Sequence, residues 1–178
     1  MVFASLIAVI FIAFVFGRKV FSVKYKTAII VLIIFSILLG LLLSTIFLVF
    51  TIDSIFTSFV VTSLMFGIVS VFGYFTKKDL TSLRMLCFTG LIGIVLAGAI
   101  NILIMNDKVS FISSLVGVIM FTLIVAADTQ TIKERLSASK NMDEINKISL
   151  YSALMLYLDF INIFIRILGF MKKQKQRN

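Results

Sequence analysis

Residues 148–170 read Ile-Ser-Leu-Tyr-Ser-Ala-Leu-Met-Leu-Tyr-Leu-Asp-Phe-Ile-Asn-Ile-Phe-Ile-Arg-Ile-Leu-Gly-Phe, and this stretch decides the fold. It is long and apolar enough to enter a bilayer, yet it carries Asp159, Asn162 and Arg166. On a helix that turns by about 100° per residue, these three lie within about 60° of one another. An aspartate at mid-span costs on the order of 2.5–3.5 kcal/mol in hydrocarbon. We therefore expect this face to form a polar seam inside a helical bundle.

The composition of the whole chain indicates a membrane protein. Of the 178 residues, 61% are hydrophobic, whereas soluble domains average about 45–50% apolar residues. The net charge of +9 comes from short basic clusters between apolar segments. Such clusters are typical of membrane-flanking loops and supply no basic face for nucleic acid.

Six apolar segments predict an all-α fold, a polytopic membrane helical bundle that forms one integral membrane domain over residues 1–178. The segments cover roughly 1–17, 27–50, 55–76, 81–105, 109–132 and 148–170. Most reach the length of about 20 residues that a spanning helix needs. The first is shorter and has no basic residue before it, so it is interpreted as a membrane helix rather than a secretory signal. A basic tail, 171–178, ends the chain.

The charges of the loops predict the orientation of the helices. Three loops are rich in lysine and arginine, near 18–26, 77–84 and 133–147. The loops near 51–54 and 106–108 hold one lysine beside two aspartates, so the positive-inside rule places the first three in the cytoplasm. The basic tail conflicts with simple alternation. Either the last segment re-enters without crossing, or it is a central helix whose neighbours impose its direction.

Local patterns predict helix contacts and one helix start. Small residues at helical spacing, which let helix backbones approach closely, predict contact faces on two segments. They are Gly90, Gly93, Ala97 and Asn101 on one, and Ser63, Gly67 and Ser70 on the other. Thr76 and Asp79 have the spacing of a capping box, so Asp79 is expected to cap the following helix.

Missing residue types argue against an enzyme. The chain has no histidine and only one cysteine, Cys87, so it lacks histidine-based triads, histidine metal sites and thiolate clusters. It also lacks the glycine patterns that bind nucleotides. Asp128 and Asp159 do not stand in the local motif of an intramembrane aspartyl protease. No cofactor is expected, apart from Ca²⁺ and H⁺ as transported or regulatory ions.

Two carboxylates, Asp128 and Asp159, are the candidates for chemistry. Two such groups close together in a low dielectric share a proton and could hold a hard cation such as Ca²⁺. The alternative is that each bonds only a neighbouring amide, arginine or water. Counting at 1.5 Å per residue places Asp128 about 7 Å and Asp159 about 20 Å from their loop ends. They meet only if the fifth helix continues past the membrane edge or the last helix is recessed.

Several blocks of the sequence resemble the Bax inhibitor-1 family. They are Phe-Gly-Tyr-Phe-Thr-Lys-Lys-Asp-Leu-Thr-Ser-Leu (72–83), Gly-Leu-Ile-Gly (90–93), Ala-Asp-Thr-Gln-Thr-Ile (127–132) and Ala-Leu-Met-Leu-Tyr-Leu-Asp-Phe-Ile-Asn-Ile-Phe (153–164). Gly-Leu-Leu-Leu-Ser-Thr-Ile (40–46) fits the family's third helix. In order and spacing the resemblance covers essentially the whole chain.

The resemblance implies a fold of seven helices in which six surround a central seventh. It implies a bacterial plasma (inner) membrane protein, and bacterial members are similar to pH-sensitive calcium leak channels. Other members of the family are regulators of membrane proteolysis or of a stress or cell-death response, which is the alternative that the resemblance implies. The family's paired aspartates match Asp128 and Asp159, and an arginine of the second family helix is matched most closely by Arg18. Arg166 is a further partner, inferred from the seam itself.

The chain differs from the family pattern in two respects. It has no counterpart of the first family helix, so its six segments match helices two to seven. Arg84 stands where many members have glycine, at an exposed helix start where little effect is expected. Two functions follow from these patterns: a pH-gated Ca²⁺ leak pathway tuned by Asn162 and Arg166, or a non-conducting regulator that binds a membrane protease or another integral membrane protein.

Overall fold

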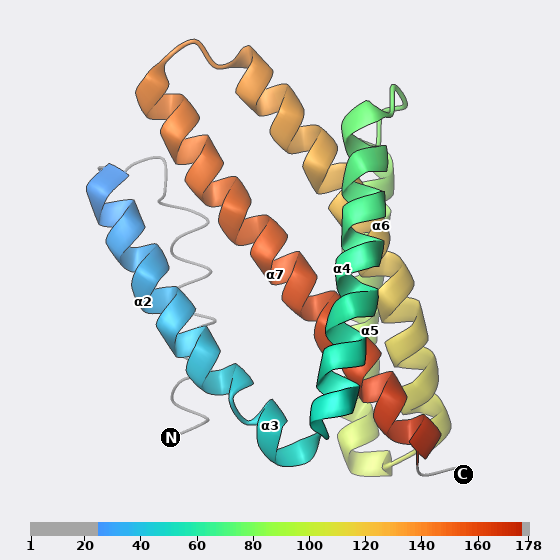
Figure 1. Ribbon diagram of the computed structural model, residues 1–178. Coiled ribbons are helices and arrows are strands. Elements are labelled where there is room, and N and C mark those ends of the chain that lie inside the picture. Colours follow the sequence, from blue (N-terminus) through green and yellow to red (C-terminus); the bar gives the residue numbers. More distant parts are fainter. Residues whose placement is uncertain (1–24, 176–178) are drawn as a thin grey trace. The chain divides into compact units, whose positions relative to one another are not determined.

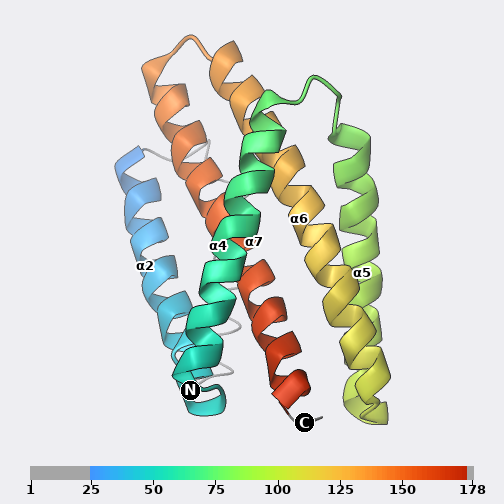
Figure 2. The same cartoon turned by 45° about the vertical axis from the view of Figure 1, so that its right-hand side comes forward.

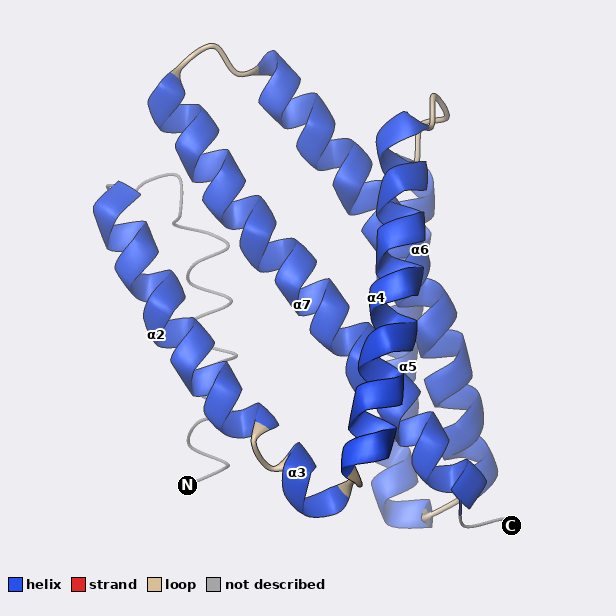
Figure 3. Ribbon diagram, viewed as in Figure 1, coloured by secondary structure: helices blue, strands red, loops and turns tan. Residues whose placement is uncertain are grey.

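The structure is a computed structural model that describes residues 25–175. Within this range every regular element is an α-helix (Figure 3). The helices are α2 (Tyr25–Leu43), α3 (Ile46–Val49), α4 (Ile52–Phe75), α5 (Thr81–Ile104), α6 (Asp107–Ala138) and α7 (Met142–Lys175). Five spans are long and apolar enough to cross a membrane. The all-α fold class is thus confirmed for the described residues, and the expected segment 1–17 lies outside them.

The last two helices extend well beyond the apolar segments that predicted them. Helix α6 has 32 residues and α7 has 34. Their added turns are polar, so a count of apolar residues misses them. The side chain of Asn141 accepts the N–H of Asp143 at 3.0 Å and starts α7. Acidic Asp143 and Glu144 follow in its first turn, where the helix dipole favours negative charge.

The chain divides into two compact units. Of the described residues, the first contains 25–51 and 134–155, and the second contains 52–133 and 156–175. The second unit therefore holds α4, α5, most of α6 and the C-terminal half of α7 (Figure 1). Both candidate aspartates belong to this second unit, so the site can be described within it.

In the second unit, α6 and α7 run antiparallel. The ring of Phe111 packs on that of Phe170 with centroids 5.0 Å apart, and Ser113 bonds Arg166. The residue numbers of the contacting partners therefore decrease along α7 as they increase along α6. The C-terminal end of α7 consequently lies beside the α5–α6 turn (Figure 2). Helix α7 runs without a break to Lys175.

The closest helix approach in the second unit involves a glycine that the small-residue pattern did not include. A Cβ on Gly73 of α4 would lie 2.8 Å from the Cα of Ala126 on α6. Of the predicted contact glycines, Gly90 lies against the side chain of Met120, as expected. The prediction is wrong for Gly67 and Gly93, because a Cβ there would meet no described atom within 4 Å. Spacing alone does not say which of two small faces is covered.

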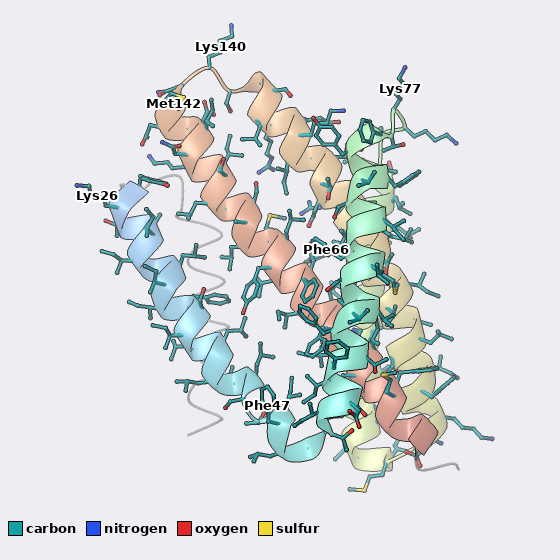
Figure 4. The ribbon with its side chains drawn as sticks, in the orientation of Figure 1. Lys26, Phe47, Phe66, Lys77, Lys140 and Met142 are labelled. Atoms are coloured by element: carbon teal, nitrogen blue, oxygen red, sulfur yellow. The ribbon has the colours of Figure 1, made fainter. Side chains whose placement is uncertain are left out.

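Aromatic rings fill the space between α4 and α7. The ring centroids of Phe59 and Phe66 lie 5.7 Å and 5.6 Å from that of Phe160, and both pairs are edge-to-face. Phe66 is labelled in Figure 4, on the side of α4 that faces α7. Edge-to-face pairs contribute about 0.5–1.5 kcal/mol each beyond their buried area. They hold α7 against α4 one residue beyond Asp159.

Asp79 bonds the first turn of α5 from the position before the N-cap residue, which is Leu80. Its Oδ1 accepts the backbone N–H of Thr81 at 2.8 Å. Bonds from the Thr81 hydroxyl and N–H hold the pKa of Asp79 below its ordinary value. The full capping box does not form, because Thr76 accepts the N–H of Lys78 instead.

Candidate functional site

Asp128 lies in the most enclosed part of α6. Residues 124–128 are all buried, and the Asp128 side chain is only 3% exposed. A run of five buried residues covers every side of a helix, since it exceeds one turn of 3.6 residues. Neighbouring helices therefore surround α6 at this level, and its carboxylate faces protein rather than lipid.

Asp159 on α7 is buried like Asp128, with 8% of its surface exposed. The charged groups that act on its carboxyl are Asp128 on α6 and Arg84 on α5. Its Oδ2 has no hydrogen-bond partner among the residues that the structure describes. The two aspartates that the sequence singled out thus face one another, from two different helices.

Helix α6 is longer than the apolar pattern predicted. The sequence required either a fifth helix that continues past the membrane edge or a recessed last helix. Helix α6 continues to Ala138, five residues beyond Lys133, which adds about 7.5 Å to its length at 1.5 Å per residue. Helix α7 also begins earlier than predicted, at Met142, so the added length of α6 alone does not bring the two aspartates level.

Arg84 is part of this site, and the expectation that it would have little effect is wrong. It lies in the first turn of α5, as expected, and its side chain is 40% exposed. Its Nε nevertheless donates to Oδ1 of Asp128 and forms an ion pair with it. The error has a physical cause, because a long side chain can leave its stem exposed and still place its charged group in the interior.

Gln130 is a site residue that the sequence analysis missed. Its side chain is buried on α6, two residues from Asp128. Its Oε1 accepts the N–H of Leu80 at 2.9 Å, and its Nε2 donates to the carbonyl of Lys78 at 2.9 Å. Gln130 therefore fixes the α4–α5 loop on α6, and this loop leads directly to Arg84. The available signal was its place in the block Ala-Asp-Thr-Gln-Thr-Ile (127–132), beside Asp128.

The hydrogen bonds of Asn162 and Arg166 go to backbone carbonyls and not to the aspartate pair. Asn162 donates to the carbonyl of Leu158 on its own helix at 2.9 Å. Arg166 donates through Nη1 to the carbonyl of Ser113 at 3.2 Å. It is seven residues from Asp159, or about 10 Å along α7. Their predicted role in tuning the pair stays a prediction. Arg18 lies outside the described residues.

The site has few of the oxygen ligands that a resident Ca²⁺ would need. Ca²⁺ takes about six to eight oxygens. Among the described residues, no group of three or more His, Cys, Asp or Glu side chains converges. The pair Asp128 and Asp159 also has the cation Arg84 beside it. The arrangement suits a proton or a passing cation better than a stored one.

Comparisons with known proteins agree with the fold class of a multi-pass helical membrane protein. The family described as "Inhibitor of apoptosis-promoting Bax1" matches residues 1–177. The chain is 41% identical over 138 residues to the inner membrane protein YbhL of Escherichia coli K12. The matched region covers 76% of this chain and 58% of YbhL. It is 35% identical over 160 residues to a protein of Rickettsia prowazekii. This matched region covers 90% of this chain and 66% of that protein.

A membrane protein of Streptococcus pyogenes serotype M6 is 35% identical over 138 residues, covering 78% of this chain and 60% of the relative. The chain thus spans about three fifths to two thirds of the length of these relatives. The family match extends over nearly all of its residues, and its apolar helices fit a multi-pass membrane protein. The chain belongs to the Bax inhibitor-1 family.

Proposed function

We propose that the chain provides a proton-sensitive Ca²⁺ leak pathway in which Asp128 and Asp159 form the controlling site. The observation that supports this most directly is a pair of buried carboxyls on two helices, one with an oxygen that lacks a hydrogen bond among the described residues. Two carboxylates in a low dielectric repel one another unless a proton or cation neutralises them. The bacterial inner membrane is the proposed location, in line with the description of YbhL.

In the closed state of the proposed pathway, Arg84 is bound to Asp128. Its guanidinium already neutralises Asp128, so an incoming cation must compete with it. Protonation of the pair weakens the hold of Arg84, because the ion pair needs an ionised Asp128. The charged groups that face the site are then Asp128 from α6, Asp159 from α7 and Arg84 from α5.

The test is Ca²⁺ flux into liposomes that contain the purified full chain. Wild type should conduct Ca²⁺ at a rate that changes with pH, and Asp159→Asn should remove that pH dependence. Asp53→Asn is the matched control, since it removes an exposed carboxylate in the first turn of α4. A pH-dependent flux that survives in Asp159→Asn contradicts the proposal.

The Arg84–Asp128 ion pair supplies a second variant. Arg84→Gln keeps a long polar side chain but removes the charge that competes for Asp128. Flux should rise above the wild-type rate at neutral pH, where the ion pair is intact. Lys77→Gln, in the loop before α5, removes one exposed charge and should leave the flux unchanged. A lower flux in Arg84→Gln contradicts the closed state described above.

A second candidate function is a non-conducting regulator that binds a membrane protease or another integral membrane protein. The same ion pair favours it, because a neutralised Asp128 is also what a purely structural site would contain. This function predicts no flux from the purified chain and a specific partner recovered by crosslinking in cells. Strong flux from the purified chain alone counts against it.

A further inference from the structure

A second polar region lies in the other end of the second unit, around Arg166. Residues of α5, α6 and α7 line an open cavity of about 620 Å³ there. Its lining mixes apolar side chains, such as Ile94 and Val95, with polar groups from each helix. The volume equals that of about twenty water molecules at about 30 Å³ each. Arg166 is the cationic side chain of this lining.

The guanidinium of Arg166 is held in place by three contacts. Nη1 donates to the carbonyl of Ser113 at 3.2 Å, and Cζ lies 5.1 Å from the centroid of the Phe121 ring. The group also lies against Gly117, where any Cβ would overlap it. A guanidinium fixed in this way loses little further freedom when it binds a ligand, which favours affinity.

Arg166 carries a half-buried charge that forms no salt bridge with a described carboxylate. The salt bridges among the described residues join Arg84 to Asp128 and Lys147 to Asp143. A guanidinium has five N–H donors, and the hydrogen bond to Ser113 uses one of them. Charged groups within membrane spans are normally paired or exposed to a water-filled cavity. The remaining donors of Arg166 border the cavity, whose lining also includes Asp107.

Hydroxyl groups extend the donor set. Ser110 and Ser113 line the cavity on α6. Ser110 Oγ accepts from Asn101 at 2.8 Å, so its own proton remains to be donated. Asp107 contributes one carboxylate to the lining. Its negative charge makes the binding of a doubly charged anion less favourable than that of a singly charged one. The lining therefore suits a single oxyanion with several acceptor oxygens.

We propose that this cavity binds one phosphate oxyanion, held by the Arg166 guanidinium and the hydroxyls of Ser110 and Ser113. Arginine matches phosphate oxygens with paired N–H donors. Basic pockets between membrane helices bind phospholipid headgroups in other proteins. The cavity exceeds the size of a bare anion, and Ile94 and Val95 offer apolar contact to a glycerol or acyl segment. The phosphate can thus belong to a phospholipid or be free in solution, and the site does not depend on ion conduction.

Thermal unfolding of the detergent-solubilised full chain tests the site with three ligands. They are inorganic phosphate, a short-chain phosphatidylglycerol, and the matching diacylglycerol that lacks phosphate. A ligand that binds the folded state raises the unfolding temperature with dose. We expect phosphatidylglycerol to raise it and diacylglycerol not to. A rise with phosphate beyond that of sodium chloride at equal ionic strength identifies a free anion as a further ligand.

Variants locate the binding. Arg166→Gln should weaken the apparent affinity at least about tenfold, since hydrogen bonds to charged groups contribute about 1.5–3 kcal/mol. Gly117→Ala keeps the charge but displaces the guanidinium, so it should weaken binding as well. Lys77→Gln, at the opposite end of the second unit, is the matched loss of one charge and should bind as wild type (Figure 4).

If either Arg166→Gln or Gly117→Ala folds poorly, the other variant alone still shows whether the affinity for the ligand is lost. Binding of phosphatidylglycerol only assigns the site to a lipid headgroup, and binding of phosphate only assigns it to a soluble anion. Absence of binding by both in wild type overturns the proposal. Equal affinity in wild type and in the variants that fold also overturns it.

Discussion

Replacing Gln130 by leucine tests whether one buried amide holds the α4–α5 loop in place. The two side chains are similar in size, so the change removes hydrogen bonds with little change in volume. It deprives the N–H of Leu80 and the carbonyl of Lys78 of their partners, each 2.9 Å away. Leu80 is buried, whereas Lys78 is exposed. Water can therefore replace the partner of the Lys78 carbonyl but not that of the Leu80 N–H.

The expected loss follows from that difference. A buried donor left without an acceptor costs about 1–3 kcal/mol, while an exposed carbonyl costs little. For a protein of this size, each kcal/mol lowers the unfolding temperature by about 2–4 °C. Gln130→Leu should therefore unfold about 2–12 °C below wild type. Since the loop leads to Arg84, the same variant should also loosen the Arg84–Asp128 ion pair.

Circular dichroism during thermal unfolding in detergent measures this loss. Thr129→Val is the matched control on the neighbouring residue, because the Thr129 hydroxyl bonds only the Val125 carbonyl of its own helix. We expect its unfolding free energy to change by about 0.5 kcal/mol or less. An unfolding temperature for Gln130→Leu equal to that of the control would show that water or another donor–acceptor pair replaces the amide.

Two further predictions concern helix packing and a helix start. Gly73→Ala should destabilise the protein by about 1–3 kcal/mol through overpacking, because its Cβ meets the backbone of Ala126, which cannot rotate away. Gly67→Ala should instead stabilise the protein by up to about 1 kcal/mol through helix propensity, because no described atom lies within 4 Å of the new Cβ. Changes in unfolding temperature of the same sign for the two variants, relative to wild type, would contradict this pair of expectations. Asp79 has a pKa below its ordinary value of 3.8, so its stabilising effect should be present above that pH and disappear as the pH falls through the folded pKa. Unfolding of wild type and Asp79→Asn across this range measures the effect, and a stability difference that persists in strong acid would contradict it.

The candidate site was only partly predictable from sequence. Asp159 was identified because a carboxylate at mid-span is costly in hydrocarbon, and this reasoning needs no coordinates. Its relation to Asp128 depends on where α6 ends, which the apolar pattern did not give. Arg84 and Gln130 were not predicted as site residues, because each reaches Asp128 or the loop from a different helix. Contacts between helices depend on rotation and crossing, which local spacing does not specify.

The direction of the basic tail illustrates the same limit. Loop charges conflicted with the tail, and two arrangements remained open. The contact pairs Phe111–Phe170 and Ser113–Arg166 place the C-terminal end of α7 beside the α5–α6 turn. Packing against α4 and α6 thus sets the direction of α7 within the second unit, whatever its own flanking charges favour.

The sequence by itself determined that the chain is an all-α membrane protein, that residues 148–170 carry a polar seam, and that Asp128 and Asp159 are its unusual groups. These conclusions depend on transfer costs, which are properties of single residues and segments. Only the tertiary structure decided that Arg84 pairs with Asp128, that Gln130 fixes the adjoining loop, and that Arg166 borders a separate cavity. These are properties of pairs of helices, and they depend on a fraction of a turn in the rotation of each helix.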